Sequence, residues 1–248
     1  MRLDGKTAIV TGAASGFGAG IARKFVAEGA QVMVVDLNHD GAMAMAEELG
    51  GGSFGHKANV ADAAEVKGVV ETAREVFGNV DILVNNAGVT HLPAPMEEVS
   101  EADFDRVFAV NCKSIYLFAR ELVPPMKAQG SGAILNVSST AGLSPRPNLN
   151  WYNSSKGWVN TATKAMAVEL APAGIRVNAL NPVAGETPLL ASFMGEDTPE
   201  MRAKFLSTIP LGRFSQPEDM GNAACFLCSD EASMITGVLL EVDGGRCI

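Results

Sequence analysis

The stretch TGAASGFG, residues 11–18, decides the fold of this chain. It follows the apolar run TAIV at residues 7–10 and leads into a segment whose apolar residues recur at the spacing of a helix. Glycines at positions 12, 16 and 18 make this a turn from a strand into a helix. Such a turn gathers free backbone N–H groups and the positive end of a helix dipole, and glycines let a pyrophosphate approach them. The sequence therefore predicts a site for the phosphates of a dinucleotide.

A carboxylate ends the next apolar run, QVMVVD at residues 31–36. Asp36 can accept hydrogen bonds from both ribose hydroxyls of an adenosine, and it would repel a 2′-phosphate. No lysine or arginine stands in the glycine turn or directly after Asp36. A helix cap or a solvated strand end is the alternative role for this carboxylate. The pattern favours NAD as the cofactor over NADP.

Short runs rich in Val, Ile and Leu alternate with segments of helical spacing along the whole chain. Several runs lack polar alternation, which is typical of strands covered by helices on both faces. This alternation predicts a doubly wound Rossmann fold, a single domain over residues 1–248 with about seven parallel strands flanked by helices. The expected strands are 7–10, 31–36, 53–58, 81–86, 133–138, 175–180 and 238–242. The expected helices are 16–28, 61–77, 101–129 with a bend at Pro124–Pro125, 152–170 and 217–228.

One region interrupts the alternation. From Asn181 to Arg213 several prolines and glycines surround two short helical patterns. A long excursion after the carboxyl end of a strand lies over the crevice where such sheets bind ligands. We expect a substrate lid over about residues 183–213.

Composition excludes several classes of partner. Among 248 residues, 28 acidic and 19 basic residues give a net charge of −9, and no basic run is present, so nucleic acid is not expected. The apolar runs are too short or too interrupted to cross a membrane, which predicts a cytoplasmic protein. Cys225 and Cys228 have the spacing of a metal or redox pair, but a second pair of ligands is missing. Core packing is the favoured role, and no metal site is expected.

The hexapeptide WYNSSK at residues 151–156 places Tyr152 and Lys156 on one helix face. A nearby ammonium favours the phenolate of a tyrosine, whose unperturbed pKa is about 10. This spacing is common by chance, so other features must support a chemical pair. Ser138 and Ser139 end the fifth apolar run, and Asn111 stands inside an apolar helical stretch, where an amide needs a partner.

Taken together, these motifs resemble the short-chain dehydrogenase/reductase family over essentially the whole chain. The resemblance rests on TGAASGFG at 11–18, NNAG at 85–88, Asn111, NVSS at 136–139, YNSSK at 152–156, the segment from Asn181 to Thr187, and DGG at 243–245. It implies that Tyr152 is the general acid/base and that Lys156 lowers its pKa and binds the nicotinamide ribose. Ser139, 13 residues before Tyr152, would hold the substrate oxygen, and Asn111 would anchor a water that passes protons toward Lys156.

The resemblance also implies a set of cofactor-binding residues. They are Gly12, Ser15, Gly16, Phe17, Gly18, Asp36, Asn59, Val60, Asn86, Ala87, Gly88, Tyr152, Lys156, Pro182, Val183 and Thr187. Two positions depart from the family pattern: Pro182–Val183 replaces the common Pro-Gly, and Asn59 stands where aspartate is frequent beside the adenine.

The expected substrate is a small-molecule secondary alcohol or ketone. His91, Arg146, Asn148 and Trp151 are the candidates for its pocket. Arg146 fits either an anion anchor or a solvated loop arginine. The resemblance implies a homotetramer paired through helices 101–129 and 152–171, although burial within one chain explains Tyr116, Phe118, Trp158 and Met166 equally well.

Three alternatives to an NAD-dependent dehydrogenase of secondary alcohols remain. One is a 3-oxoacyl-[acyl-carrier-protein] reductase, which usually takes NADP, and another is a sugar 1-dehydrogenase of the glucose type. A dinucleotide-binding regulator without turnover is the third, but it has no need of Asn111, Ser139, Tyr152 and Lys156 together.

Overall fold

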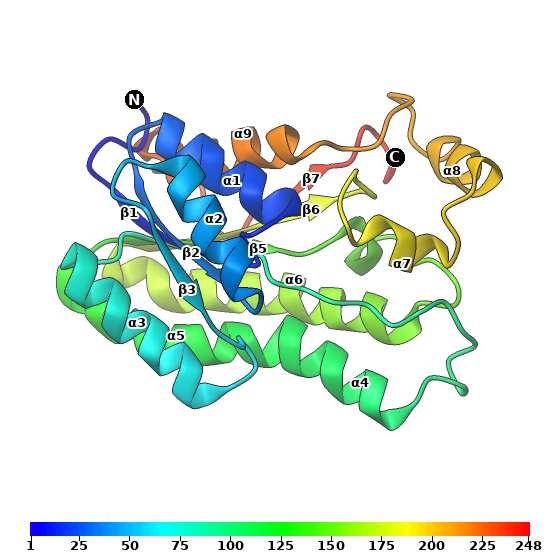
Figure 1. Ribbon diagram of the computed structural model, residues 1–248, viewed down its shortest axis with the longest axis horizontal. Coiled ribbons are helices and arrows are strands. Elements are labelled where there is room, and N and C mark those ends of the chain that lie inside the picture. The colour runs from blue at the N-terminus through cyan, green and yellow to red at the C-terminus, as the bar shows by residue number, and fades with distance from the viewer.

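The structure is a computed structural model that describes residues 1–248, and its centre is one parallel seven-stranded sheet (Figure 1). The strands are β1 (Thr7–Thr11), β2 (Gln31–Asp36), β3 (Phe54–Lys57), β4 (Ile82–Asn85), β5 (Gly132–Val137), β6 (Ile175–Pro182) and β7 (Leu239–Val242). Their order in the sheet is β3-β2-β1-β4-β5-β6-β7. The chain leaves β1 toward β2 on one side and returns to β4 on the other, so a crevice opens at the carboxyl ends of β1 and β4. This confirms the predicted Rossmann fold with all seven strands.

Helices cover both faces of the sheet (Figure 1). They are α1 (Gly16–Ala27), α2 (His39–Leu49), α3 (Ala63–Phe77), α4 (Glu101–Phe108), α5 (Ser114–Gln129), α6 (Asn150–Leu170), α7 (Leu190–Met194), α8 (Pro199–Leu206) and α9 (Pro217–Cys228). Short turns are η1 (Ala109–Lys113), η2 (Thr140–Gly142), η3 (Ala171–Ala173) and η4 (Asp230–Ala232). None of the helices is long and apolar enough to cross a bilayer.

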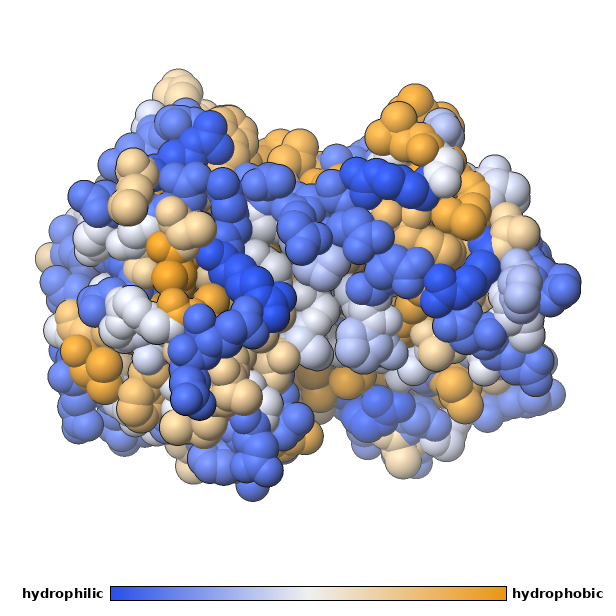
Figure 2. Space-filling view, turned by 45° about the horizontal axis from the view of Figure 1, so that its top comes forward, coloured by the Kyte–Doolittle hydropathy of each residue, from blue (hydrophilic) through white to orange (hydrophobic).

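The segment of residues 183–213 carries α7 and α8 beyond the carboxyl ends of the strands (Figure 1). Together with the adjoining Phe214 it forms a small core of its own, made of Val183, Leu190, Met194, Phe205, Ile209 and Phe214. The C-terminus lies against its end, where Leu211 N–H donates to Gly244 O at 3.1 Å. The molecular surface is hollowed between this segment and the side of the molecule that holds α1 and α2 (Figure 2).

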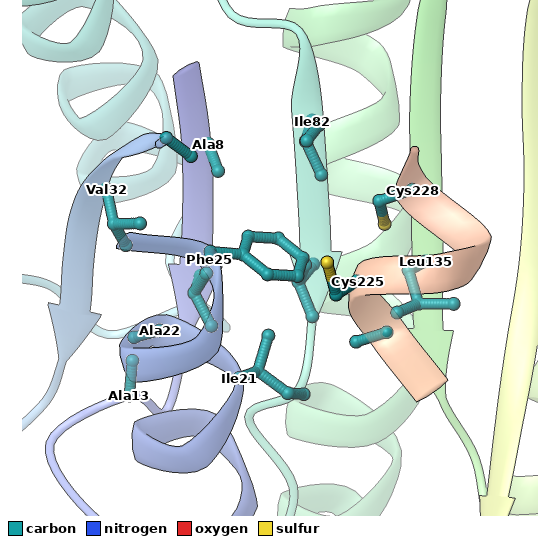
Figure 3. Packing of buried hydrophobic residues seen from close by; sticks show 14 of the residues in the cluster. Ala8, Ala13, Ile21, Ala22, Phe25, Val32, Ile82, Leu135, Cys225 and Cys228 are labelled. Atoms are coloured by element: carbon teal, nitrogen blue, oxygen red, sulfur yellow. The ribbon is translucent and has the colours of Figure 1, made fainter. Parts of the chain in front are cut away.

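Two larger cores lie on opposite faces of the sheet, because successive residues of each strand point in opposite directions. Ala8 and Val10 belong to the core under α1, α2 and α9, whereas Ile9 belongs to the core under α3, α5 and α6. In the first core, Phe25 reaches between the strands and α9, where Cys225 and Cys228 face it (Figure 3). Both cysteines are buried as free thiols, as predicted for core packing.

The interruption of the helix expected over 101–129 does not lie at the prolines. The α-helix α5 continues through Pro124 and Pro125. Pro124 has no N–H, so the carbonyl of Arg120, four residues earlier, lacks its helical hydrogen bond. Both residues are exposed, and water can replace the missing donor. Instead, the π-helical turn η1 separates α4 from α5 at Asn111. Such wide turns are frequent at functional sites.

Two other expectations need correction. The helix α2 was not among the expected elements, although the Asn38 side chain caps it by accepting from Gly41 N–H at 3.1 Å. Phe118 is fully buried in the second core and is not available for subunit pairing. Tyr116 and Trp158 are exposed at 56% and 41%, so only they keep much surface for a partner.

Candidate active site

The glycine turn is held by the next strand of the sheet. Gly12 has a φ of +62°, in the left-handed region that favours glycine, and a Cβ at Gly18 would lie 2.3 Å from Gly12 O. The Asn86 side chain, at the end of β4, donates to Thr11 O at 2.8 Å and to Gly12 O at 3.1 Å. The turn therefore requires glycine at both positions and owes its position to Asn86.

Gly16 keeps open the space between the glycine turn and the segment 183–213. A Cβ on Gly16 would lie 3.3 Å from the side chain of Thr187, and both residues line the same cavity. This cavity has a volume of about 450 Å³. Every residue of the cofactor set lines it except Gly18, which packs beneath the turn. The residues present therefore fit a dinucleotide.

Asp36 lies at the carboxyl end of β2 with its carboxylate tied to two backbone amides. Ala14 N–H donates to one oxygen at 3.1 Å and Asn38 N–H to the other at 3.0 Å. A carboxylate oxygen can accept more than one hydrogen bond, so both oxygens can still accept from a ribose. Asn59 follows β3 and uses its side-chain oxygen to accept from Ala61 N–H at 3.0 Å.

Tyr152 and Ser139 meet in the same cavity, although Tyr152 is on α6 and Ser139 precedes η2. Burial of Tyr152 raises the pKa of its phenol to about 12, and the hydrogen bond with Ser139 acts in the opposite direction. Ser138 has a different role, because its hydroxyl donates to Lys156 O at 3.0 Å and joins β5 to α6.

Lys156 is 5% exposed, and its Nζ donates to Val137 O at 2.9 Å. Its Nζ lies 5.8 Å from the centroid of the Tyr152 ring. Burial lowers the pKa of Lys156 to about 8. Lys156 was expected to lower the pKa of Tyr152. In the protein without cofactor, burial has the larger effect on both groups, and the pKa of Tyr152 is raised instead.

The amide of Asn111 finds its partners in the loop after β4 and in α6. Its oxygen accepts from Val89 N–H at 2.9 Å, and its nitrogen donates to Val89 O at 2.9 Å and to Ser155 Oγ at 3.0 Å. A Cβ on Gly88 would lie 3.4 Å from Lys156 Nζ and 3.5 Å from Asn111 Oδ1. Asn111 thus lies next to Gly88, as Lys156 does, but it does not line the cavity, and its side chain is fixed by protein groups.

Of the four substrate-pocket candidates, the structure brings only Arg146 to the cavity wall. The Trp151 indole donates to Met96 O at 3.0 Å and stacks edge-on against Phe104, so it anchors a loop. His91 is buried with Nδ1 at 2.8 Å from Leu92 O. Asn148 is exposed in the left-handed region, with a φ of 64°. None of these three lines the cavity.

The cavity also contains residues that are not among the four named candidates for the substrate pocket. Phe193 of α7 stacks edge-on against Tyr152, with ring centroids 5.0 Å apart. Phe205 of α8 and Ser144 line the wall near Arg146. No short motif marks these residues, because they come together only when the segment 183–213 folds over the strand ends.

A doubly wound sheet with a glycine turn at its crevice, and a serine, a tyrosine and a lysine in the same cavity, defines a dinucleotide-dependent oxidoreductase. The family model described as enoyl-(acyl carrier protein) reductase matches residues 12–246. The chain belongs to the short-chain dehydrogenase/reductase family and is an oxidoreductase that acts on CH–OH groups and the corresponding carbonyls.

Three relatives cover essentially the whole chain. A crystal structure of 3-ketoacyl-(acyl-carrier-protein) reductase from Brucella melitensis complexed with NADH has a TM-score of 0.95 and 52% identity, and covers 99% of this chain and 100% of its own. The 4-formylbenzenesulfonate dehydrogenase of Comamonas testosteroni is 50% identical over 100% of both chains. The 3-oxoacyl-[acyl-carrier-protein] reductase of Thermotoga maritima is 42% identical, also over 100% of both chains.

Proposed function

We propose that this protein transfers a hydride between NAD(H) and a secondary alcohol or ketone, with Tyr152 as its general acid/base. The observation that carries the proposal is that Ser139, Tyr152 and Lys156 line one cavity together with the glycine turn and Asp36. The carboxylate of Asp36 favours the free ribose hydroxyls of NAD over a 2′-phosphate. The Brucella relative complexed with NADH supports this choice of cofactor.

Each of the proposed site residues has its own role in the reaction. In reduction, Ser139 donates a hydrogen bond to the substrate oxygen, where negative charge develops, and Tyr152 supplies the proton to that atom. Lys156 holds the nicotinamide ribose and Asp36 holds the adenosine ribose. The bound cofactor would carry the hydride, and its nicotinamide ring is positively charged in the oxidised form. In oxidation the phenol must give up its proton first, so the ammonium of Lys156 has to offset the burial of Tyr152. Asn111 lies next to Gly88, as Lys156 does, and fits a proton path toward Lys156.

The test is substitution of the proposed proton donor. Tyr152→Phe removes the hydroxyl and should lower kcat for alcohol oxidation by about a thousandfold or more, while NADH still binds. Tyr116→Phe is the matched control, because Tyr116 lies on α5 and does not line the cavity, so this variant should keep the wild-type rate. Wild-type kcat in Tyr152→Phe would rule out the mechanism, and a strong preference of the wild type for NADPH would rule out the assignment of NAD.

A second candidate substrate class is a 3-oxoacyl thioester, because two of the relatives are named as reductases of such carrier-bound substrates. The acidic chain argues against docking of an acidic carrier protein. Steady-state kcat/KM for acetoacetyl thioester with NADH, compared with kcat/KM for simple ketones, distinguishes the two classes.

We also propose a homotetramer and a cytoplasmic location. The exposed Tyr116 and Trp158 on the long helices α5 and α6 fit a subunit contact. Light scattering of the purified protein measures the assembly directly.

A further inference from the structure

Arg146 lines the cavity, in which Asp36 and Lys156 are the other charged residues. Its guanidinium carbon lies 4.4 Å from the centroid of the Phe205 ring, and its Nη2 donates to Thr208 Oγ1 at 3.0 Å. The Asn153 side chain donates to Arg146 O at 2.7 Å. The start of α6 and the segment 183–213 therefore fix this arginine from two sides.

A second arginine approaches from the C-terminus. The carboxylate of Asp243 accepts from Gly245 N–H at 2.9 Å and from Cys247 N–H at 2.8 Å, which fixes the turn that presents Arg246. Arg246 Nη1 donates to Ser144 Oγ at 3.2 Å, and Ser144 lines the cavity two residues before Arg146. The Nε of Arg246 is buried without a hydrogen-bond partner. Most N–H donors of the two guanidinium groups are thus unused by the protein.

No carboxylate forms an ion pair with either arginine. Neither Arg146 nor Arg246 takes part in any ion pair of the structure. Burial and the charge of Arg246 lower the pKa of Arg146. Arg176 is a useful contrast, because its guanidinium donates to the backbone carbonyls of Leu227, Ser229 and Ile235 and serves the fold alone. Arg146 lines the cavity, whereas Arg246 lies behind this wall and reaches it through Ser144. Two arginines without an ion-pair partner so close to one wall are unusual in a chain with a net charge of −9.

We propose that Arg146 and Arg246 together bind an anionic oxygen group on the substrate, a carboxylate or a sulfonate, separate from the reacting alcohol or ketone. The planar forks of the guanidinium groups match such oxyanions, and an anion between them removes their mutual repulsion. Thr208 and Ser144 hold the two side chains in place for it. This inference rests on the proposed function, because the anion is placed on the substrate of that same cavity.

The adenosine end of the cofactor does not account for the two arginines, and its pyrophosphate is assigned to the glycine turn after β1. Arg146 follows β5, whereas Asp36 and Asn59 follow β2 and β3. In the sheet, β1 and β4 lie between β2 and β5. Neighbouring strands are about 4.8 Å apart, so the two regions differ by about 14 Å across the sheet. The arginines therefore lie on the side of the crevice away from Asp36.

The test compares three secondary phenylethanols that carry a para carboxylate, a para sulfonate or a neutral para carboxamide. With NAD⁺, kcat/KM for an anionic alcohol should exceed kcat/KM for the carboxamide by about tenfold or more. Arg146→Met and Arg246→Met should each lower this ratio by about tenfold, because each removes hydrogen bonds to a charged group. The two anions differ in shape, so their relative kcat/KM identifies the preferred oxyanion. Arg74→Met removes an exposed positive charge on α3, away from the cavity, and should leave the ratio unchanged.

A binding measurement on the wild-type protein needs no variant and no turnover. In the presence of saturating NADH, calorimetry should show benzenesulfonate binding at least about tenfold more tightly than benzenesulfonamide. Equal affinity for the two compounds, or the same kcat/KM for carboxylate and carboxamide, overturns the inference. The proposed function is judged separately, since oxidation of the neutral alcohol that depends on Tyr152 would uphold it even if the anion preference is absent.

Discussion

A lysine with almost no contact with water stands beside the phenol of the active site. Lys156 has one protein acceptor, Val137 O, for three N–H donors. Its charged form is therefore under-satisfied in the folded protein, and burial lowers its pKa from 10.5 to about 8. The same burial raises the pKa of Tyr152 to about 12. These residues are arranged for proton control at the expense of stability.

This arrangement predicts a pH-dependent stability cost that belongs to Lys156. The folded protein disfavours the ammonium, so the penalty is full below pH 8 and falls as pH rises from about 8 toward the unfolded pKa of 10.5. In Lys156→Met the penalty is absent. At pH 7 the variant should gain on the order of 1–3 kcal/mol of unfolding free energy, less the lost bond to Val137 O.

Urea unfolding of wild type and variant between pH 7 and pH 10 measures this cost. The cysteines and Tyr152 titrate in both proteins, so the difference between the two curves belongs to Lys156 and its charge interaction with Cys112, and it should shrink as pH rises. A difference that stays constant over this range would contradict burial of the ammonium as the cause. Lys156→Met should also lose turnover. The same substitution would then raise the stability of the protein and abolish its activity.

At the scale of elements, two helices pack backbone to backbone behind the glycine turn. A Cβ on Gly20 of α1 would lie 2.3 Å from Pro217 O at the start of α9, and a Cβ on Gly221 of α9 would lie 2.6 Å from Gly20 O. These contacts involve backbone atoms, so the helices can admit a methyl group only by moving apart. Because α1 begins at Gly16, its displacement would also move the proposed pyrophosphate site.

Gly20→Ala should therefore lower the free energy of unfolding by about 1–3 kcal/mol and weaken NADH binding. Gly68→Ala is the matched control in the interior of α3, because a Cβ there meets nothing within 4 Å. It should raise stability by about 0.5–1 kcal/mol, since alanine is the better helix former. Chemical denaturation and NADH fluorescence titration of both variants check the pair, and equal effects of the two substitutions would refute the role of close backbone contact.

The elements also explain how far sequence alone could lead. The inner strands were predictable because burial on both faces leaves continuous apolar runs such as QVMVVD, whereas the edge strand β3, FGHK, has only one buried residue and no such run. The π-helical turn at Asn111 was not, since apolar spacing does not distinguish one wide turn within a helix. Ser139, Tyr152 and Lys156 could be assigned through a motif with fixed spacing. The proximity of Arg246 to Arg146 could not be predicted from the sequence. It depends on how the end of segment 183–213 and the C-terminal turn fold against the loop that holds Arg146.

On the scale of the whole molecule, the two main cores share one sheet, whereas the segment 183–213 keeps a core of its own. Five residues of the segment and the adjoining Phe214 form this core, and none of them belongs to either large cluster. Its helices α7 and α8 have 5 and 8 residues, too short to be stable without packing. Elements with few buried contacts open with less free energy than the rest of a protein. We therefore expect the segment to open and close over the cavity while the sheet stays folded.

Hydrogen exchange should show this division directly. Without cofactor, amides of α7 and α8 should exchange much faster than those of β1 and β5, and NADH should slow them because Thr187 and Val183 border the cavity. Phe214→Ala, in the small core, should speed hydrogen exchange in α7 and α8 alone. In contrast, Phe25→Ala, in the core under α1 and α9, should lower the free energy of unfolding by about 3–5 kcal/mol and speed exchange throughout the protein. Equal exchange in α7, α8 and the central strands of the wild type would mean that the molecule opens only as one unit.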